Sequence, residues 1–311
     1  MGVLVVGSIH ADFYVKTWKF PSPGETVRGS SFFVLTGGKG ANQAVGCARL
    51  GVPAYLVSAV GGDDLGRMVL RDVLSKGVDV SYVHVDPGTH TGVAFIVLNE
   101  STGENLIVVA PGADDSLRPE HVEKALAGLQ GRARVLLTQL EVPLDTVYYA
   151  LRRCKELGLV TVLNPAPARK LDPKALEYVD VLTPNRVEAT QLVGVDASSL
   201  EGALRAGEKL AEVGLKAVVL TLGGDGALLV TRGSAKHVPA FRVRVVDTVG
   251  AGDAFNAGLA VAIYEGMGLE RAVLFANAVA ALKITRVGAQ SVPDRREVEE
   301  FLASRGGLRE L

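Results

Sequence analysis

Short apolar runs alternate with stretches of helical spacing along most of the chain. The run Val3 to Val6 has no polar position, as expected for a strand buried on both faces. Apolar runs with one polar residue each recur at 135–138, 159–163, 179–182 and 217–221. Apolar residues with helical spacing occupy 41–50, 65–76, 144–157, 199–213, 253–264 and 270–284, and a charged helix is expected from Arg295. This alternation predicts an α/β fold with a mostly parallel sheet covered by helices.

Segments within the first 110 residues break this pattern and predict a second, smaller sheet. Residues 13–36 contain a turn followed by extended, alternating sequence, without helical spacing. Residues 91–98 and 105–109 are rich in β-formers and are separated by a turn-rich segment. We predict a single domain over 1–311 with an inserted β lid, formed by about 13–36 and 91–110, that opens and closes over a site.

Polar residues follow several predicted strands. His10 and Asp12 come after the first strand, Glu141 after the strand at 135–138, and Asn185 with Glu188 after the strand at 179–182. In open α/β sheets, ligands bind at the carboxyl ends of the strands. The shared placement therefore predicts one site at this edge of the sheet.

The stretch from Asp247 to Gly258 carries the strongest candidate chemistry. A short apolar strand at 243–246 is expected to lead into a glycine-containing turn and then a helix. Gly250, Ala251 and Gly252 lie where that helix begins, and the free N–H groups of a helix start bind phosphate. A carboxylate in the same turn, Asp253, would repel phosphate if binding were its only role. It is interpreted as the base that deprotonates a hydroxyl attacking the phosphate, the alternative for this motif alone being a helix N-cap.

Three other motifs allow more than one interpretation. The glycine-rich stretch 37–44 is neither a P-loop nor a dinucleotide fingerprint, but Lys39 and Asn42 suit a polyhydroxyl ligand. Asn185 and Glu188, three residues apart, could hold a hydrated Mg2+ ion or simply cap a helix. The glycine-rich turn at 223–226 allows close approach of a planar or phosphorylated ligand, or forms a tight hairpin.

Composition excludes several classes. The 33 basic and 34 acidic residues give a net charge of −1 without a basic block, which argues against a nucleic-acid binder. No apolar run reaches the ~18 residues of a membrane span. No signal-peptide pattern is recognised at the N-terminus, and Cys47 and Cys154 are expected to be buried free thiols. A cytoplasmic enzyme fits these features.

The chain resembles the ribokinase-like (PfkB) carbohydrate kinase family essentially from end to end. Two family signatures match 37–44 and 247–258, with shorter matches at 7–9, 20–27, 164–169, 183–185 and 288–290. The resemblance implies a three-layer α/β/α sandwich with a small β-sheet lid. It also implies ATP-dependent phosphorylation of D-ribose at O5, and a homodimer formed through the lid.

The resemblance also implies roles for individual residues. Asp253 would be the catalytic base, and the N–H groups of Gly250, Ala251 and Gly252 the anion hole. Sugar-contacting positions are matched by His10, Ala11, Asp12, Gly38, Lys39, Gly40, Ala41, Asn42 and Glu141. Nucleotide, magnesium and phosphate positions are matched by Asn185, Glu188, Thr221, Leu222, Gly223, Gly224, Asp225, Gly226, Gly252 and Asn277. A loop for K+, largely through backbone carbonyls, is matched by Asp247, Val249, Lys283, Arg286, Gly288 and Ser291.

The chain departs from the family pattern in three places. His10 replaces a usual asparagine that touches the sugar, Gln290 runs directly to Ser291 without the usual proline, and Arg186 stands where an acid is common. The first departure leaves open a kinase for another pentose, such as 2-deoxyribose, or for a nucleoside. A non-catalytic sugar sensor is a further alternative, against which Asp253 and the anion-hole sequence argue.

Overall fold

The computed structural model describes residues 1–305, and its centre is a nine-stranded sheet. The strand order is β13-β12-β11-β10-β9-β8-β1-β4-β5, parallel from β11 to β5 and antiparallel at β12 and β13. The strands are β1 (Gly2–Val6), β4 (Ala54–Gly61), β5 (Val78–Asp86), β8 (Ala133–Thr138), β9 (Val160–Leu163), β10 (Val181–Leu182), β11 (Ala217–Thr221), β12 (Ala227–Thr231) and β13 (Ser234–Val238). The mostly parallel sheet is confirmed.

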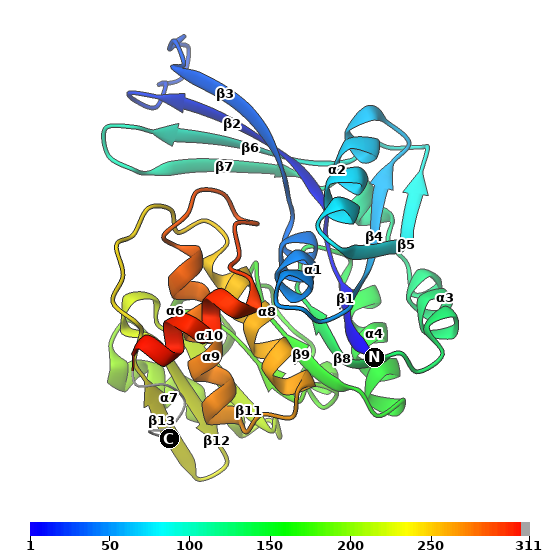
Figure 1. Cartoon of the computed structure of the whole chain (residues 1–311), viewed down its shortest axis with the longest axis vertical. Coiled ribbons are helices and arrows are strands. Elements are labelled where there is room, and N and C mark those ends of the chain that lie inside the picture. Colours follow the sequence, from blue (N-terminus) through cyan, green and yellow to red (C-terminus); the bar gives the residue numbers. More distant parts are fainter. Residues whose placement is uncertain (306–311) are drawn as a thin grey trace.

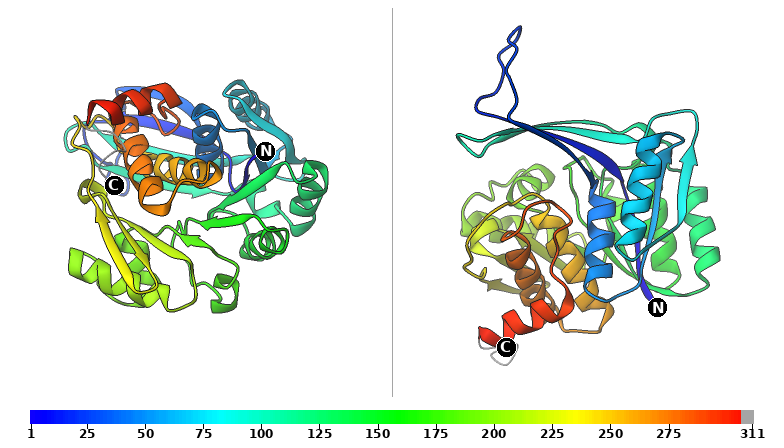
Figure 2. Two further views of the ribbon diagram at one scale, coloured as in Figure 1. Left: turned by 60° about the horizontal axis from the view of Figure 1, so that its bottom comes forward. Right: turned by 45° about the horizontal axis from the view of Figure 1, so that its top comes forward.

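Helices cover both faces of this sheet, because alternate strand residues point to opposite sides. One core contains Val3 and Val5 together with α1 (Lys39–Arg49), α2 (Asp64–Ser75), α8 (Ala251–Tyr264), α9 (Leu269–Lys283) and α10 (Arg295–Ser304). The other contains Leu4 and Val6 with α3 (Pro119–Leu129), α4 (Leu144–Glu156), α5 (Pro173–Leu176), α6 (Arg186–Val193) and α7 (Leu200–Ala211). The left view of Figure 2 shows these two helical layers on either side of the strands, which confirms the three-layer sandwich.

A separate four-stranded sheet projects from this body (Figure 1). Its order is β3 (Ser31–Gly37), β2 (His10–Thr17), β6 (Gly92–Asn99) and β7 (Asn105–Ala110). The second sheet is therefore confirmed, although β2 begins at His10, three residues before the expected start. As a result, His10, Ala11 and Asp12 belong to this second sheet, which was expected to form the lid.

The apolar strand expected at 243–246 is wrong. These residues form no strand, and Val245 and Val246 are 56% and 53% exposed. The N–H groups of Val246 and Asp247 instead donate to the carbonyl of Ile284, just beyond α9, at 2.8 and 3.1 Å. Because both N–H groups bond to this carbonyl, the segment leads into α8 without joining a sheet. Helix α8 begins at Ala251, not at Asp253 as expected.

Two smaller expectations concern burial and membranes. Cys47 and Cys154 are buried free thiols, as predicted. None of the helices within residues 1–305 combines the length and hydropathy of a membrane-spanning segment. Two short 3-10 helices, η1 (Gly112–Ser116) and η2 (Gly223–Asp225), complete the elements of the described residues.

Candidate active site

Backbone N–H groups gather at the start of α8. Gly250 is the N-cap with φ +76°, and a Cβ there would lie 2.7 Å from the Cα of Ala289, so only glycine fits. Ala251 N–H donates within the turn to the carbonyl of Thr248 at 3.1 Å. Gly252 and Asp253 follow at positions whose N–H groups have no partner inside a helix. No atom lies within 4 Å of a Cβ built at Gly252, so space for an anion exists there.

Asp253 is buried and its carboxylate is held by two side-chain amides from α1. Asn42 Nδ2 donates to Oδ2 at 2.9 Å, and Gln43 Nε2 donates to Oδ1 at 3.0 Å. The Gln43 amide is itself oriented, because its Oε1 accepts from Gln139 Nε2 at 2.5 Å. Each Asp253 oxygen keeps a further lone pair. The arrangement orients a carboxylate that can still accept a proton.

Asp12 is a buried acceptor without a partner. Its Oδ1 makes no hydrogen bond with any described residue. Burial raises the pKa of Asp12 to about 6, the charges of Glu141 and Asp253 add to this, and His10 opposes it. Gly37 leaves room for this carboxylate, since a Cβ there would lie 2.0 Å from Asp12 Oδ2. A buried unpaired acceptor is costly unless a ligand donates to it.

His10 forms an ion pair with a residue that sequence reasoning missed, Asp114. His10 Nε2 lies 2.6 Å from Asp114 Oδ2, while Asp114 Oδ1 accepts from Ile9 N–H at 3.1 Å. Burial lowers the pKa of His10, but the hydrogen bond and charge of Asp114 outweigh it and raise the pKa to about 9. The protonated ring therefore keeps Nδ1–H as a fixed donor. Asp114 is 104 positions from His10 in η1, and no local pattern marks the pair.

Residues that the resemblance matches to sugar-contacting positions also link the turn at 7–9 to the start of α1. Glu141 Oε2 accepts from Ser8 Oγ at 2.5 Å and from Lys39 N–H at 2.9 Å. Gly38, Gly40 and Ala41 pack against the turn at 7–9, where Ala41 N–H donates to Ser8 O at 2.9 Å. These three residues position the backbone of that turn, which leads directly into β2 with His10 and Asp12.

A pocket of about 210 Å³ lies beside the start of α8. It is lined by Lys39, Asn164, Ala166, Thr183, Asn185, Glu188, Thr221, Thr248, Gly250, Ala251, Gly252, Asp253 and Asn256. The structure thus brings the candidate base, the open amides, one lysine and the Asn185–Glu188 pair to one cavity. The charge of Asp253 raises the pKa of Lys39 despite burial, so a cation faces this cavity.

Several residues that the resemblance matches to nucleotide-contacting positions do not line this pocket. Asp225, in η2, pairs with Arg186 at 2.7 Å. Asn277, on α9, uses Nδ2 to donate to the carbonyl of Val238 at 3.0 Å. Leu222, Gly223, Gly224 and Gly226 form the connection between β11 and β12. A ligand longer than this pocket would have to extend toward these elements.

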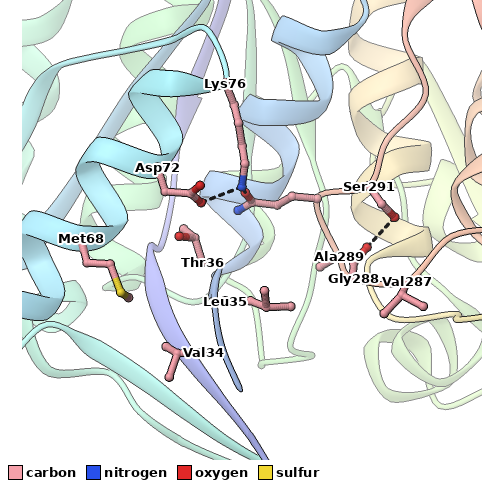
Figure 3. Close-up of a pocket in the computed structure, with 11 residues that line it drawn as sticks. Val34, Leu35, Thr36, Met68, Asp72, Lys76, Val287, Gly288, Ala289 and Ser291 are labelled. Atoms are coloured by element: carbon pink, nitrogen blue, oxygen red, sulfur yellow. Dashed lines mark hydrogen bonds and ion pairs between the residues drawn. The ribbon is translucent and has the colours of Figure 1, made fainter. Parts of the chain in front are cut away.

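A second pocket, of about 350 Å³, lies between β3, α2 and the loop 287–291 (Figure 3). Lys76 Nζ donates there to Asp72 Oδ2 and Gln290 Oε1, both at 2.6 Å. Gln290 Nε2 then donates to Asn42 Oδ1 at 3.1 Å. Since Asn42 contacts Asp253, a chain of hydrogen bonds runs from this pocket to the candidate base.

Comparison with known proteins agrees with this geometry. Residues 2–295 match the model of the pfkB family carbohydrate kinases. The chain belongs to this family. It is 40% identical to a ribokinase of Bacillus subtilis, covering 97% of this chain and 99% of that protein. It is 36% identical to a deoxyribokinase of Salmonella typhi, with 97% and 99% covered.

The fold of this carbohydrate kinase also matches solved structures. The ribokinase of Arabidopsis thaliana, complexed with ribose and ATP, has a TM-score of 0.88 and 32% identity, over 96% of this chain and 97% of that chain. The ribokinase of Thermotoga maritima has a TM-score of 0.87 and 36% identity, over 97% and 99%. ATP is therefore the implied phosphoryl donor, while ribokinases and deoxyribokinases are similar enough that identity alone does not select the sugar.

The Asn185–Glu188 pair fits a hydrated Mg2+ ion. The two residues form a capping box, in which Glu188 N–H donates to Asn185 Oδ1 and Asn185 N–H donates to Glu188 Oε2, both at 2.8 Å. Asn185 Nδ2 also donates to Glu188 Oε1 at 2.8 Å. Capping and metal binding are compatible, because each of these oxygens keeps a further lone pair and both residues line the pocket. No group of three or more His, Cys, Asp or Glu side chains within 1–305 could form a closed metal site. Such an ion would keep most of its waters, as magnesium usually does.

The loop matched to K+ does not fit that ion. Lys283 Nζ donates to the carbonyl of Asp247 at 3.0 Å, and Ser291 Oγ donates to the carbonyl of Gly288 at 2.7 Å. Arg286, also matched to this loop, directs its guanidinium to Glu297. A potassium ion at the Asp247 carbonyl would lie beside the buried Lys283 ammonium, and the two positive charges would repel each other.

Proposed function

We propose that this kinase transfers the γ-phosphoryl group of ATP to O5 of D-ribose. The observation that carries the proposal is the buried Asp253 carboxylate, held by Asn42 and Gln43 beside the open amides at the start of α8. The unpaired Asp12 oxygen, buried in the same region, supplies an acceptor for a sugar hydroxyl. The ribokinase relatives support ribose as the sugar.

In the proposed reaction, Asp253 takes the proton of the ribose O5 hydroxyl. O5 then forms a bond to the γ-phosphorus while the bond from that phosphorus to the β,γ-bridging oxygen breaks, and ADP leaves. The amides of Gly252 and its neighbours, with Lys39, stabilise the negative charge that develops on the transferred group. Mg2+, held through water by Glu188 and Asn185, would neutralise charge on the ATP phosphates.

The choice of sugar rests on His10 and Asp12. At neutral pH the fixed Nδ1–H of His10 and the unpaired oxygen of Asp12 present one donor and one acceptor to the sugar hydroxyls. A sugar that lacks a hydroxyl leaves one such charged group unpaired, which costs about 1.5–3 kcal/mol per hydrogen bond. We therefore expect kcat/KM with ATP to be at least ~10-fold higher for D-ribose than for 2-deoxyribose or a nucleoside.

A substrate panel read by ADP release checks this expectation. Equal or higher kcat/KM for 2-deoxyribose or for a nucleoside would reassign the substrate within the family. If none of the sugars raises ADP release above background, a sensor is favoured. Ribose binding measured by calorimetry then separates a sensor for ribose from a protein that does not recognise ribose.

The pKa of Asp12 predicts an acid limb in the pH profile. Because burial raises this pKa to about 6, the carboxylate becomes protonated, and loses its charge, as the pH falls through that value. We expect kcat/KM for ribose to fall roughly tenfold from pH 7 to pH 5, with a smaller change in kcat. Asp12→Asn should lower kcat/KM at pH 7 and lose this limb. An unchanged limb in that variant would assign the titration to another group.

We propose that the protein forms a homodimer through the lid. One face of the lid sheet carries Val15, Phe32, Phe95, Leu106 and Val108, and Phe32, Phe95 and Val108 are 63%, 54% and 68% exposed. Such a contiguous exposed apolar face marks an interaction surface. Light scattering should give twice the chain mass, and Phe95→Asp should give monomers. Leu157→Asp, at an exposed position beyond α4, is the control and should remain dimeric; a monomeric wild-type protein would refute the proposal.

A further inference from the structure

Helix α9 ends in a lysine whose side chain is completely buried. Lys283 is 0% exposed, although lysine is almost never fully buried without a partner. Its Nζ donates to the backbone carbonyl of Asp247 at 3.0 Å, and the Asp247 carboxylate lies 4.0 Å away. The ammonium group therefore sits against the residue that begins the turn into the anion hole.

Asp247 connects the two loops that border the anion hole. Its Oδ1 accepts from Val249 N–H at 2.9 Å, inside the turn that leads to Gly250. Its Oδ2 accepts from Gly288 N–H at 2.8 Å, in the loop whose Ala289 packs against Gly250. A positive charge behind Asp247 balances this carboxylate and holds the carbonyl of the same residue. Through Asp247, Lys283 is therefore linked to both loops beside the start of α8.

We propose that the Lys283 ammonium takes the place of a monovalent metal ion in this loop and positions the anion hole. The role rests on the proposed phosphoryl transfer, because the anion hole acts only there. An ammonium group and a potassium ion carry the same charge and both bind carbonyl oxygens. The tether to α9 keeps the lysine at this point of the loop, so the enzyme needs no dissolved monovalent ion.

Two carboxylates act on the Lys283 ammonium. Burial lowers the pKa of this group, and the charges of Asp247 and Asp253 offset that lowering only in part. The second carboxylate is the candidate base, so the lysine charge acts on the side of the site where phosphate charge develops. Lys283 does not line the pocket at the start of α8, and its effect passes through Asp247; it is a positioning residue.

The first measurement compares wild-type activity in chloride salts of K+, Na+ and choline at equal ionic strength. We expect kcat with ribose and ATP to agree within about twofold in all three. Activation of more than ~10-fold by K+ over choline would overturn the proposal, because a dissolved ion would then be needed. In that case the Lys283 ammonium would not fill the role.

The second measurement uses Lys283→Ala, which removes the ammonium and leaves space beside the Asp247 carbonyl. In choline its kcat should be ~10- to 100-fold below wild type, and K+ or ammonium ions should restore it with saturation. Lys283→Met keeps the volume without the charge, so it should lose activity without such rescue. The matched control is Lys209→Ala, which removes an exposed lysine that donates to the carbonyl of Val193. It should show no cation dependence.

Thermal unfolding tests the same idea without turnover. The melting temperature of the wild-type protein should be the same in K+ and choline, whereas that of Lys283→Ala should rise with K+ concentration, as expected for ligand binding to the folded state. This readout separates failure of the lysine proposal from failure of the kinase proposal. A folded Lys283→Ala variant with neither stabilisation nor rescue by any monovalent ion would refute it. If the alanine variant does not fold, a K+-dependent melting temperature in the wild type would also refute it.

Discussion

Asp253→Asn is expected to lower kcat for ribose phosphorylation by about 10³-fold, within the range known for loss of a general base. Asparagine has nearly the same shape as aspartate but cannot accept the proton from O5. One amide oxygen remains to accept from Asn42 or Gln43, so the local packing should persist. Ribose affinity, measured by calorimetry, should therefore change only a few-fold. Activity is measured by coupled ADP release.

The control for this substitution is Asp64→Asn. Asp64 also lies in the first turn of a helix, but its side chain is 96% exposed, outside the site. It should retain wild-type kcat. If Asp253→Asn kept kcat within about threefold of wild type, Asp253 would not be the base. Loss of ribose binding in that variant would instead assign Asp253 to substrate binding.

Gly252→Ala is expected to lower activity without lowering the melting temperature. Gly252 lies in the first turn of α8 without a positive φ, and an added Cβ meets no protein atom within 4 Å. Replacing glycine by alanine at a compatible helical position stabilises by about 0.4–1 kcal/mol. The new methyl group, however, extends into the pocket where the phosphate charge must approach the amides. We expect kcat/KM for ATP to fall by about 10²-fold, while the melting temperature stays the same or rises.

Gly268→Ala provides the comparison for this variant. Gly268 is the N-cap of α9, has φ −60°, and also has no atom within 4 Å of a built Cβ. It lies outside the residues that line the phosphate pocket. Its kcat/KM should remain near the wild-type value. Wild-type kcat/KM for ATP in Gly252→Ala would mean that the phosphate does not use the start of α8.

Most of the architecture follows from patterns that are local in sequence. The unbroken apolar run Val3 to Val6 predicts a doubly buried strand, and the amphipathic run at 65–76 predicts a helix; both are confirmed within one or two residues. The strand predicted from apolar residues at 243–246 does not form, because an apolar pattern alone does not show whether a neighbouring strand is available for pairing. There the amides bond to the Ile284 carbonyl.

The candidate site depended on contacts that a sequence does not display. The small residues before Asp253 indicate an anion site, because helix starts have free amides wherever they occur. In contrast, Asp114 reaches His10 across 104 positions, and Gln43 reaches Asp253 across 210. The family resemblance matches Lys283 to a backbone ligand in a cation loop, whereas its buried ammonium, visible only in three dimensions, points to a different role.

A crystal structure of Asp253→Asn with ribose and ATP tests the central claim most directly. The account predicts that ribose O5 lies within hydrogen-bond distance, about 2.6–3.2 Å, of the side chain at position 253. The γ-phosphate should lie against the amides at the start of α8, in line with O5. A complex with both ligands bound but position 253 remote from O5, or the phosphate remote from Gly252, would contradict it.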